Sequence, residues 1–201
     1  MADLDLAYAS QKLKGTAGKD GDLLISQLHP RYYQSTVAGR VCAAYAATLA
    51  TSVPATATIG LTVWNPPGSG VRLAMTKWAS QIVATSASTT GIVLAGGFQT
   101  TTPTTVTAAT STGRMLINGT TSTAGRALAY NIATVLVVPI VLVVLHHNTA
   151  AIATTGEDTN TGDLEGSIVV DQGGFVCFAA LGGAAAASAH TMSIMWEEVV
   201  V

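Results

Sequence analysis

The sequence predicts an all-β fold: an antiparallel β-sandwich or jelly roll with an extended N-terminal arm. Short apolar runs alternate with polar residues, and turn-rich stretches such as Asn65-Pro66-Pro67-Gly68 separate them. Helical periodicity is almost absent, and Thr and Ser fill places that Lys and Glu usually take, which favours strands over helix interiors. No repeat of fixed period is present, so we do not expect a solenoid or a propeller.

We divide the chain into an arm, residues 1–36, and a sandwich body, residues 37–201. The first 22 residues carry three Lys and four Asp, and residues 14–22 form a Gly-rich, turn-rich stretch. A few apolar and aromatic side chains follow, and we expect them to pack either on a neighbouring molecule or back on the same subunit. These candidate interaction residues are Leu23, Leu24, Leu28, Tyr32 and Tyr33.

From residue 37 onward, the pattern predicts eight to ten short strands. Residues 56–64 and 71–83 flank the Pro-Pro-Gly turn and form the clearest expected hairpin. The Thr-rich stretch 100–112 is too polar and repetitive for a core and is expected to be a loop, as is the Gly- and Ala-rich stretch 182–189. The other expected strands are residues 41–49, 91–95, 114–118, 126–130, 166–171, 174–179 and 190–196, besides a Val-rich segment.

The Val-rich segment, residues 133–145, has the composition of a membrane span but not its length. Its 13 residues fall short of the roughly 20 that a helix needs to cross a bilayer. Pro139 divides it, so we expect two buried strands, or one long strand with a bulge at Pro139. We therefore expect no membrane partner.

Charge is distributed very unevenly along the chain. No Asp or Glu occurs between Asp22 and Glu157, and this stretch carries only six Lys or Arg, whereas residues 157–201 carry seven acids and no Lys or Arg. Such a charge-poor surface suits a protein that is covered by copies of itself or by a larger assembly. The basic body and the acidic C-terminal segment can complement each other within a subunit or between neighbours, or the acids serve solubility. Six bases are too sparse for nucleic-acid binding.

The sequence offers no constellation that supports catalysis, and we expect no enzyme, no cofactor and no metal. No Gly-x-Ser-x-Gly elbow or Cys-x-x-Cys pair occurs, and the adjacent acids Glu197 and Glu198 should face opposite sides of a strand. Cys42 and Cys177 lie in apolar strand-like runs and are expected to be buried free thiols, with a disulfide as the alternative.

Two further candidate interaction residues, Trp64 and Trp78, flank the Pro-Pro-Gly loop. Aromatic side chains near a loop can form a sugar-binding surface, but core packing or subunit contact is the commoner role for so few of them. Both interpretations stay open from the sequence.

Three blocks of the sequence resemble small structural proteins encoded in tailed-bacteriophage genomes. They are the run from Gly18 to Tyr33, the stretch Val63-Trp64-Asn65-Pro66-Pro67-Gly68-Ser69-Gly70, and the C-terminal Ser193-Ile194-Met195-Trp196-Glu197-Glu198. The resemblance implies a virion component with a β-sandwich body, such as a capsid cement or decoration protein. It implies no catalytic residues.

The expected function is therefore a phage capsid-associated protein that binds and stabilises the shell as a homo-oligomer, a trimer being the usual state of such jelly rolls. Its partner would be the major capsid protein, and its location the capsid surface after synthesis in the host cytoplasm. The main alternative is a receptor-binding spike or tail component that recognises host glycans. A major capsid protein and an enzyme are the remaining alternatives.

Overall fold

The computed structural model describes residues 3–8, 11–17, 23–24, 31–49, 56, 60–82, 90–109, 111–116, 125–148, 159–181 and 189–201. The chain divides into two compact units, Met1–Gln34 and Ser35–Val201, which we describe separately. The expected loop at residues 182–189 lies outside the described residues except for Ala189. The predicted interaction residue Leu28 also lies outside them.

The N-terminal unit contains a small antiparallel sheet within the residues expected to form an arm. Its strands, in spatial order, are β1 (Asp3–Tyr8), β2 (Gln11–Ala17) and β3 (Leu23–Leu24). The sequence analysis did not predict these strands, although Asp and Leu alternate through β1 as they do in a two-faced strand. A five-residue helix, α1 (Tyr33–Val37), spans the boundary between the units. No helix in the described residues is long and apolar enough to cross a membrane.

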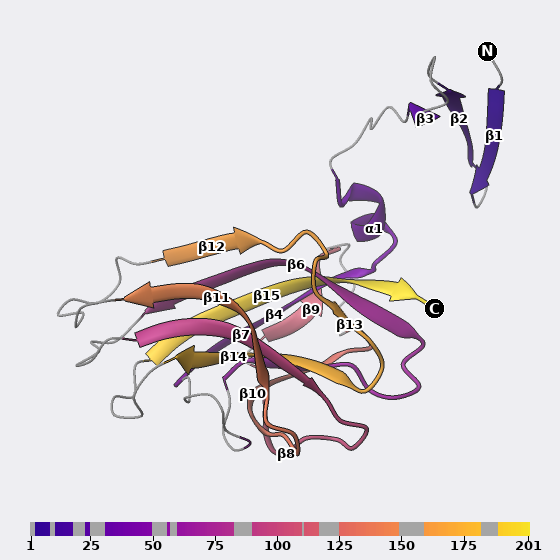
Figure 1. The fold of residues 1–201 in the computed structure, drawn as a ribbon. Coiled ribbons are helices and arrows are strands. Elements are labelled where there is room, and N and C mark those ends of the chain that lie inside the picture. The colour runs from indigo at the N-terminus through magenta and orange to yellow at the C-terminus, as the bar shows by residue number, and fades with distance from the viewer. Residues whose placement is uncertain are drawn as a thin grey trace. The chain divides into compact units, whose positions relative to one another are not determined.

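The body is a sandwich of two antiparallel sheets (Figure 1). The first sheet contains, in spatial order, β11 (Ile140–Asn148), β7 (Thr90–Phe98), β14 (Gly174–Leu181), β5 (Thr62–Trp64), β10 (Leu128–Thr134) and β8 (Thr104–Ala108). The second sheet contains β12 (Thr159–Asp163), β6 (Val71–Ile82), β15 (Ala189–Val200), β4 (Val41–Leu49) and β9 (Ser111–Arg114), and β13 (Val169–Val170) also pairs with β6. The predicted all-β sandwich is confirmed, whereas its assignment as a jelly roll stays a prediction.

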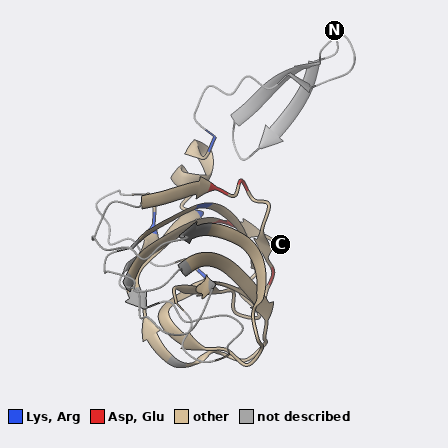
Figure 2. Ribbon diagram, turned by 60° about the vertical axis from the view of Figure 1, so that its left-hand side comes forward, with Lys and Arg blue, Asp and Glu red and all other residues tan. Residues whose placement is uncertain are grey.

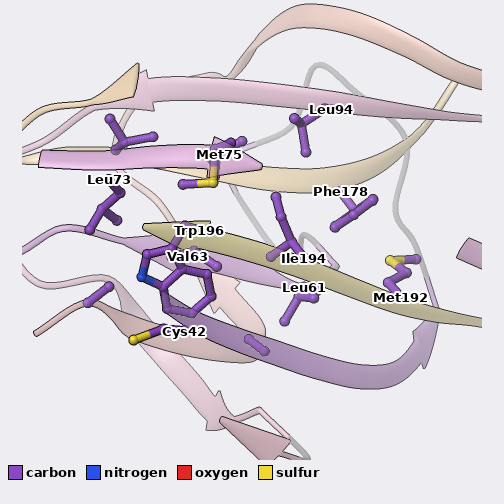
Figure 3. Packing of buried hydrophobic residues seen from close by; sticks show 14 of the residues in the cluster. Cys42, Leu61, Val63, Leu73, Met75, Leu94, Phe178, Met192, Ile194 and Trp196 are labelled. Carbon is purple, nitrogen blue, oxygen red and sulfur yellow. The ribbon is translucent and has the colours of Figure 1, made fainter. Parts of the chain in front are cut away.

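The main core lies between the two sheets (Figure 3). Trp196 and Met75 reach it from the second sheet, and Phe178 and Leu94 reach it from the first; all four side chains are fully buried. Side chains of alternating residues from both inner faces fill this layer, as in other sandwiches. Its burial is what holds the two sheets together.

A second apolar cluster covers the other face of the first sheet. Within β14, Val176 and Phe178 belong to the main core, whereas Phe175 and Cys177 belong to the second cluster together with Trp64. Successive side chains of a strand point to opposite faces, so the middle of this sheet is buried on both sides. Its strands accordingly read as nearly continuous apolar runs.

The chain between Trp64 and Val71 corrects the expected hairpin. β5 lies in the first sheet and β6 in the second, so the Pro-Pro-Gly turn carries the chain from one sheet to the other. The buried Asn65 holds this corner, because its Nδ2 donates to the carbonyl oxygens of Val71 (2.8 Å) and Val170 (3.2 Å). Two adjacent prolines cannot donate to a ladder, which explains why the strands separate here.

The Thr-rich stretch 100–112 was wrongly expected to be a loop. It contributes β8 and the start of β9, which are edge strands of the first and second sheets. Thr is β-branched, which favours a strand, and its hydroxyl group can face water. It therefore suits an edge strand, which pairs with another strand on one side only. The body has twelve strands within the described residues, more than the eight to ten expected, partly for this reason.

Candidate functional site: an apolar sheet edge

The most unusual surface of the described residues is an apolar sheet edge formed by β11 and the segment before it. Residues 136–138 and 140–144 are all Leu, Val or Ile, and all are exposed; we call them the apolar edge. Ile140 is 70% exposed, Leu136 60% and Val144 54%. Exposed large apolar side chains occur singly on most proteins, whereas a contiguous run of eight indicates an interaction surface.

The position of β11 in its sheet explains this exposure. Two buried strands, or one long strand with a bulge at Pro139, were expected across residues 133–145. β10 ends at Thr134 and β11 begins at Ile140, so most of the first expected strand is absent, and the expected burial is wrong for β11. β11 is the outermost strand of the first sheet and pairs only with β7 among the described strands. Among the described strands it has no partner on its other side, and residues 140–144 are exposed, whereas Leu145 packs against the main core.

A groove of about 310 Å³ continues the apolar edge toward the second sheet. Ile140 and Leu142 line one side, and Phe98 and Val169, which are 59% and 55% exposed, contribute to the same groove. Gly96 permits the close packing of its wall, because a Cβ there would meet the Phe175 carbonyl oxygen at 2.9 Å and Leu142 Cδ1 at 3.1 Å. The groove therefore continues the apolar edge, with Asp171 as its one charged lining residue among those described.

The charged residues of the body, coloured blue and red in Figure 2, lie outside the apolar edge, and several of them pair within the subunit. Each of three ion pairs joins a base of the body to an acid of the C-terminal segment: Arg40–Glu197 at 3.6 Å, Arg72–Asp171 at 3.3 Å and Lys77–Asp163 at 3.3 Å. The basic body and the acidic segment thus complement each other within one chain, which was one of the expected alternatives. None of the three ion pairs involves a residue of the apolar edge.

The sequence-predicted interaction residues fall in separate places. Leu23 and Leu24 form β3 of the N-terminal unit, and Tyr32 lies under the Arg31 guanidinium, 5.5 Å from the ring centroid. Tyr33 begins α1 and is exposed. These residues belong to a different unit from the two tryptophans, and each unit is described by itself.

Neither tryptophan is fully exposed, although Trp78 lines a groove over β6, β12 and β15. Trp64 is only 3% exposed and donates its Nε1 hydrogen to the Gln99 carbonyl oxygen at 3.2 Å. Trp78 is half-buried and packs against the main core, with its indole over Gly162 of β12. Core packing, the commoner of the two expected roles, accounts for both contacts.

A groove of about 390 Å³ with both polar and apolar lining residues lies over β6, β12 and β15. The paired Lys77 and Asp163 line it together with Trp78, Ser193 and Met195. Its polar groups are already engaged or exposed to solvent, and no buried, unpaired polar side chain points into it from the described lining residues. It is therefore a weaker candidate than the apolar edge.

The two cysteine thiols could react chemically, but both are buried. Cys42 and Cys177 are free and buried, as predicted. Burial raises the pKa of the Cys177 thiol to about 12, and burial, assisted by the nearby Glu198 carboxylate, raises the pKa of the Cys42 thiol to about 12. Both thiols are therefore weak nucleophiles at neutral pH.

The adjacent acids Glu197 and Glu198 face opposite sides of β15, as the sequence predicted. The buried Glu198 carboxylate accepts hydrogen bonds from the backbone N–H groups of Arg126 and Ala127. Glu197, on the other face, accepts from Ser35 Oγ at 2.6 Å and lies near Arg40. Both carboxylates hold segments of the body together, and no group of three His, Cys, Asp or Glu suited to a metal occurs among the described residues.

Comparisons with known proteins leave the fold and the surface as the basis for assigning a function. No protein-family model matches the chain, no curated protein matches it, and no solved structure matches it. The class that fold and surface define is a charge-poor β-sandwich with an uncovered apolar edge. The sequence analysis missed that edge, although the absence of charge through residues 127–145 was a readable signal.

Proposed function

We propose that this chain is a structural protein of a bacteriophage virion, of the cement or decoration type, which binds the capsid shell as an oligomer. The proposal begins with the sequence resemblance to small phage structural proteins. The observation that carries it physically is the apolar edge, because a sandwich that exposes so much apolar surface without charge is suited to an assembly that covers it.

The two-unit organisation supports a division of labour in this proposal. The N-terminal unit has its own sheet and ends next to α1, and the body has a complete core of its own. A unit that is separate from the body can contact the major capsid protein while the body contacts copies of itself. The expected trimer and the location on the capsid surface remain part of the proposal.

The alternative of a glycan-binding spike or tail component receives less support. It requires aromatic ring faces that a sugar can stack on, and Trp64 and Trp78 were the candidates. Trp64 is buried, and Trp78 packs against the core. We therefore propose the capsid role in preference to the glycan role.

Co-sedimentation with capsid shells of the phage that encodes the chain tests the proposal. We compare the full chain with a variant that lacks residues 1–34, which keeps Ser35 and its hydrogen bond to Glu197. The full chain should sediment with shells, and the truncated chain should stay in solution while its circular dichroism and thermal unfolding remain those of a folded β protein.

Two results would count against the proposal. Shells that do not retain the full chain would contradict a capsid role altogether. Equal sedimentation of the full and truncated chains would contradict the role of the N-terminal unit and would place the shell contact on the body.

A further inference from the structure

The sequence of β11 is that of an interior strand, although it lies at an edge. β14 and β11 belong to the same sheet, and both are nearly continuous apolar runs, Gly174–Leu181 and Ile140–Asn148. Such runs are typical of strands that have neighbours on both sides and layers on both faces. β14 has all of these, whereas β11 has a strand neighbour only in β7 among the described strands.

The exposed apolar surface around β11 is extensive. The apolar edge together with Phe98 and Val169 presents ten Leu, Ile, Val and Phe residues, each between 37% and 70% exposed. Monomeric proteins rarely expose so many large apolar side chains next to one another.

We propose that β11 pairs with β11 of a second copy of this chain, antiparallel and edge to edge, about a two-fold axis. Antiparallel strands exchange N–H and C=O groups symmetrically, so the uncovered side of a strand is complementary to the same side of its copy. The first sheets of the two subunits then join into one continuous sheet. The apolar side chains on both faces of β11 gain neighbours from the second copy.

The bulges of β11 place the two-fold axis. The pairing of β11 with β7 skips one residue between Val141 and Val143 and another between Val144 and His146, so the extra residues are Leu142 and Leu145. These bulges lie symmetrically on either side of the midpoint between Val143 and Val144. An axis through that midpoint sets Val143 opposite Val144 of the copy and places each bulge opposite the other.

A second copy fits the apolar edge because the edge itself contains no Asp, Glu, Lys or Arg. In the proposed register the residues from Leu142 to Leu145 lie opposite the same four residues of the copy, and Ile140 and Val141 lie opposite its two histidines, so no like-charged carboxylates or Lys and Arg side chains are brought together. This arrangement is two-fold and competes with the trimer expected from the sequence. It does not depend on capsid binding, so a failure to bind shells leaves it standing.

Light scattering after size exclusion tests the pairing with the V144K variant. The wild-type chain should elute at about 41 kDa, twice the 20.4 kDa of one chain. V144K should elute as a monomer with an apparent dissociation constant raised at least about a hundredfold, because it places an ammonium group in the apolar contact of each copy. V200K is the matched control, since Val200 is exposed at the end of β15, and it should remain a dimer.

Each other result overturns the proposal. A wild-type chain that stays monomeric at millimolar concentration, or that forms a trimer of about 61 kDa, excludes the two-fold pairing. A V144K variant that keeps the mass of the wild type shows that the contact lies elsewhere. Circular dichroism and thermal unfolding of V144K should match those of V200K. A match shows that a lower molar mass of V144K reflects dissociation of the dimer and not unfolding.

Disulfide capture tests the register independently of stability. The proposed axis sets residue 143 of one copy beside residue 144 of the other on the same face, so V143C and V144C chains should cross-link when co-expressed and oxidised in air. Neither variant should cross-link alone, because equivalent residues then lie on opposite faces. The native thiols are buried. Equal cross-linking in all three samples, or none in the mixture, overturns the register.

Discussion

The edge strands β11 and β12 lie near each other across the sandwich, yet they are built in opposite ways (Figure 1). β12 has five residues, Thr-Asn-Thr-Gly-Asp, and its Asp163 pairs with Lys77 of β6 at 3.3 Å. β11 has nine residues and begins with a run of six Ile, Val and Leu residues that carries no charge. Each is an outermost strand of its own sheet.

The two edges are protected to different degrees. Proteins prevent unwanted strand pairing by keeping edge strands short, by placing charged side chains on them and by bulges; β12 is short and charged, whereas β11 has only its two bulges. A general scarcity of charge does not explain β11, because the ion pair Lys77–Asp163 places charge on the edge of the other sheet. A long edge without charge in a molecule that charges its other edge is suited to a partner.

The largest expected contrast is in thiol reactivity. A thiol introduced on β11 by V144C should react with an aromatic disulfide reagent at pH 8 at least about 30-fold faster than Cys177, because burial raises the pKa of Cys177 from 9.0 to about 12 and also hinders access of the reagent. The measurement uses the lowest protein concentration that the assay permits, where the proposed pair is dissociated.

The pH dependence provides an internal check on this contrast. The rate for V144C should level off above about pH 10, where an exposed thiol is almost fully ionised, whereas the rate for Cys177 should still be rising at that pH. The unmodified chain, whose thiols are Cys42 and Cys177, is the control and should react fully only in denaturant. Fast reaction of that chain at pH 8 would mean that the sheet interior is open.

The next contrast concerns the free energy of unfolding of the monomer. V176A in β14 removes methyl groups from the main core and should lower it by about 2–3 kcal/mol, measured by urea denaturation. V144A in β11 removes the same groups from an exposed site and should lower it by less than about 0.5 kcal/mol in dilute solution.

Comparing V144A with V176A at several protein concentrations shows whether a partner covers β11. The cost of V144A should grow with protein concentration if copies pair through β11, while the cost of V176A should not change. Equal costs for both variants in dilute solution would mean that another part of the same chain covers β11.

A smaller effect is expected at the polar edge. A Cβ added at Gly162 would approach the Trp78 Nε1 atom to 2.5 Å, so G162A must displace the indole that packs against the core. We expect a loss of about 1–3 kcal/mol in the free energy of unfolding. T161A, at the exposed neighbouring position, is the control and should cost less than about 1 kcal/mol. A G162A variant as stable as the wild type would show that Trp78 moves aside freely.

Much of the fold follows from local sequence, and the outcome for the cysteines shows why. Alternation and turn chemistry predict strands, so the all-β sandwich, the break before β11 and the burial of Cys42 and Cys177 were predicted correctly. These properties depend on near neighbours in the sequence. The opposite orientations of Glu197 and Glu198 follow for the same reason, because strand geometry fixes them.

The order of strands in space does not follow from local sequence. A continuous apolar run predicts a strand but does not say whether it has one neighbour or two, so β11 was expected to be buried. The turn at Pro66 predicts a reversal of the chain but does not say that β5 and β6 enter different sheets. The candidate site was missed for this reason: it arises from the place of β11 in the sheet, not from an unusual motif.

The smallest expected effect concerns the ion pair on β12. Lys77 and Asp163 are both about half exposed, and D163N should lower the free energy of unfolding by only about 0.2–1 kcal/mol, a difference that about 0.5 M salt should remove. Urea denaturation at low and high salt measures it, with K77M as the reciprocal variant. The pair then serves mainly to place charge on an edge that would otherwise pair with other strands. A loss well above 1 kcal/mol would mean instead that the ion pair holds β12 on β6, and the two edges would then differ in stability and not only in protection.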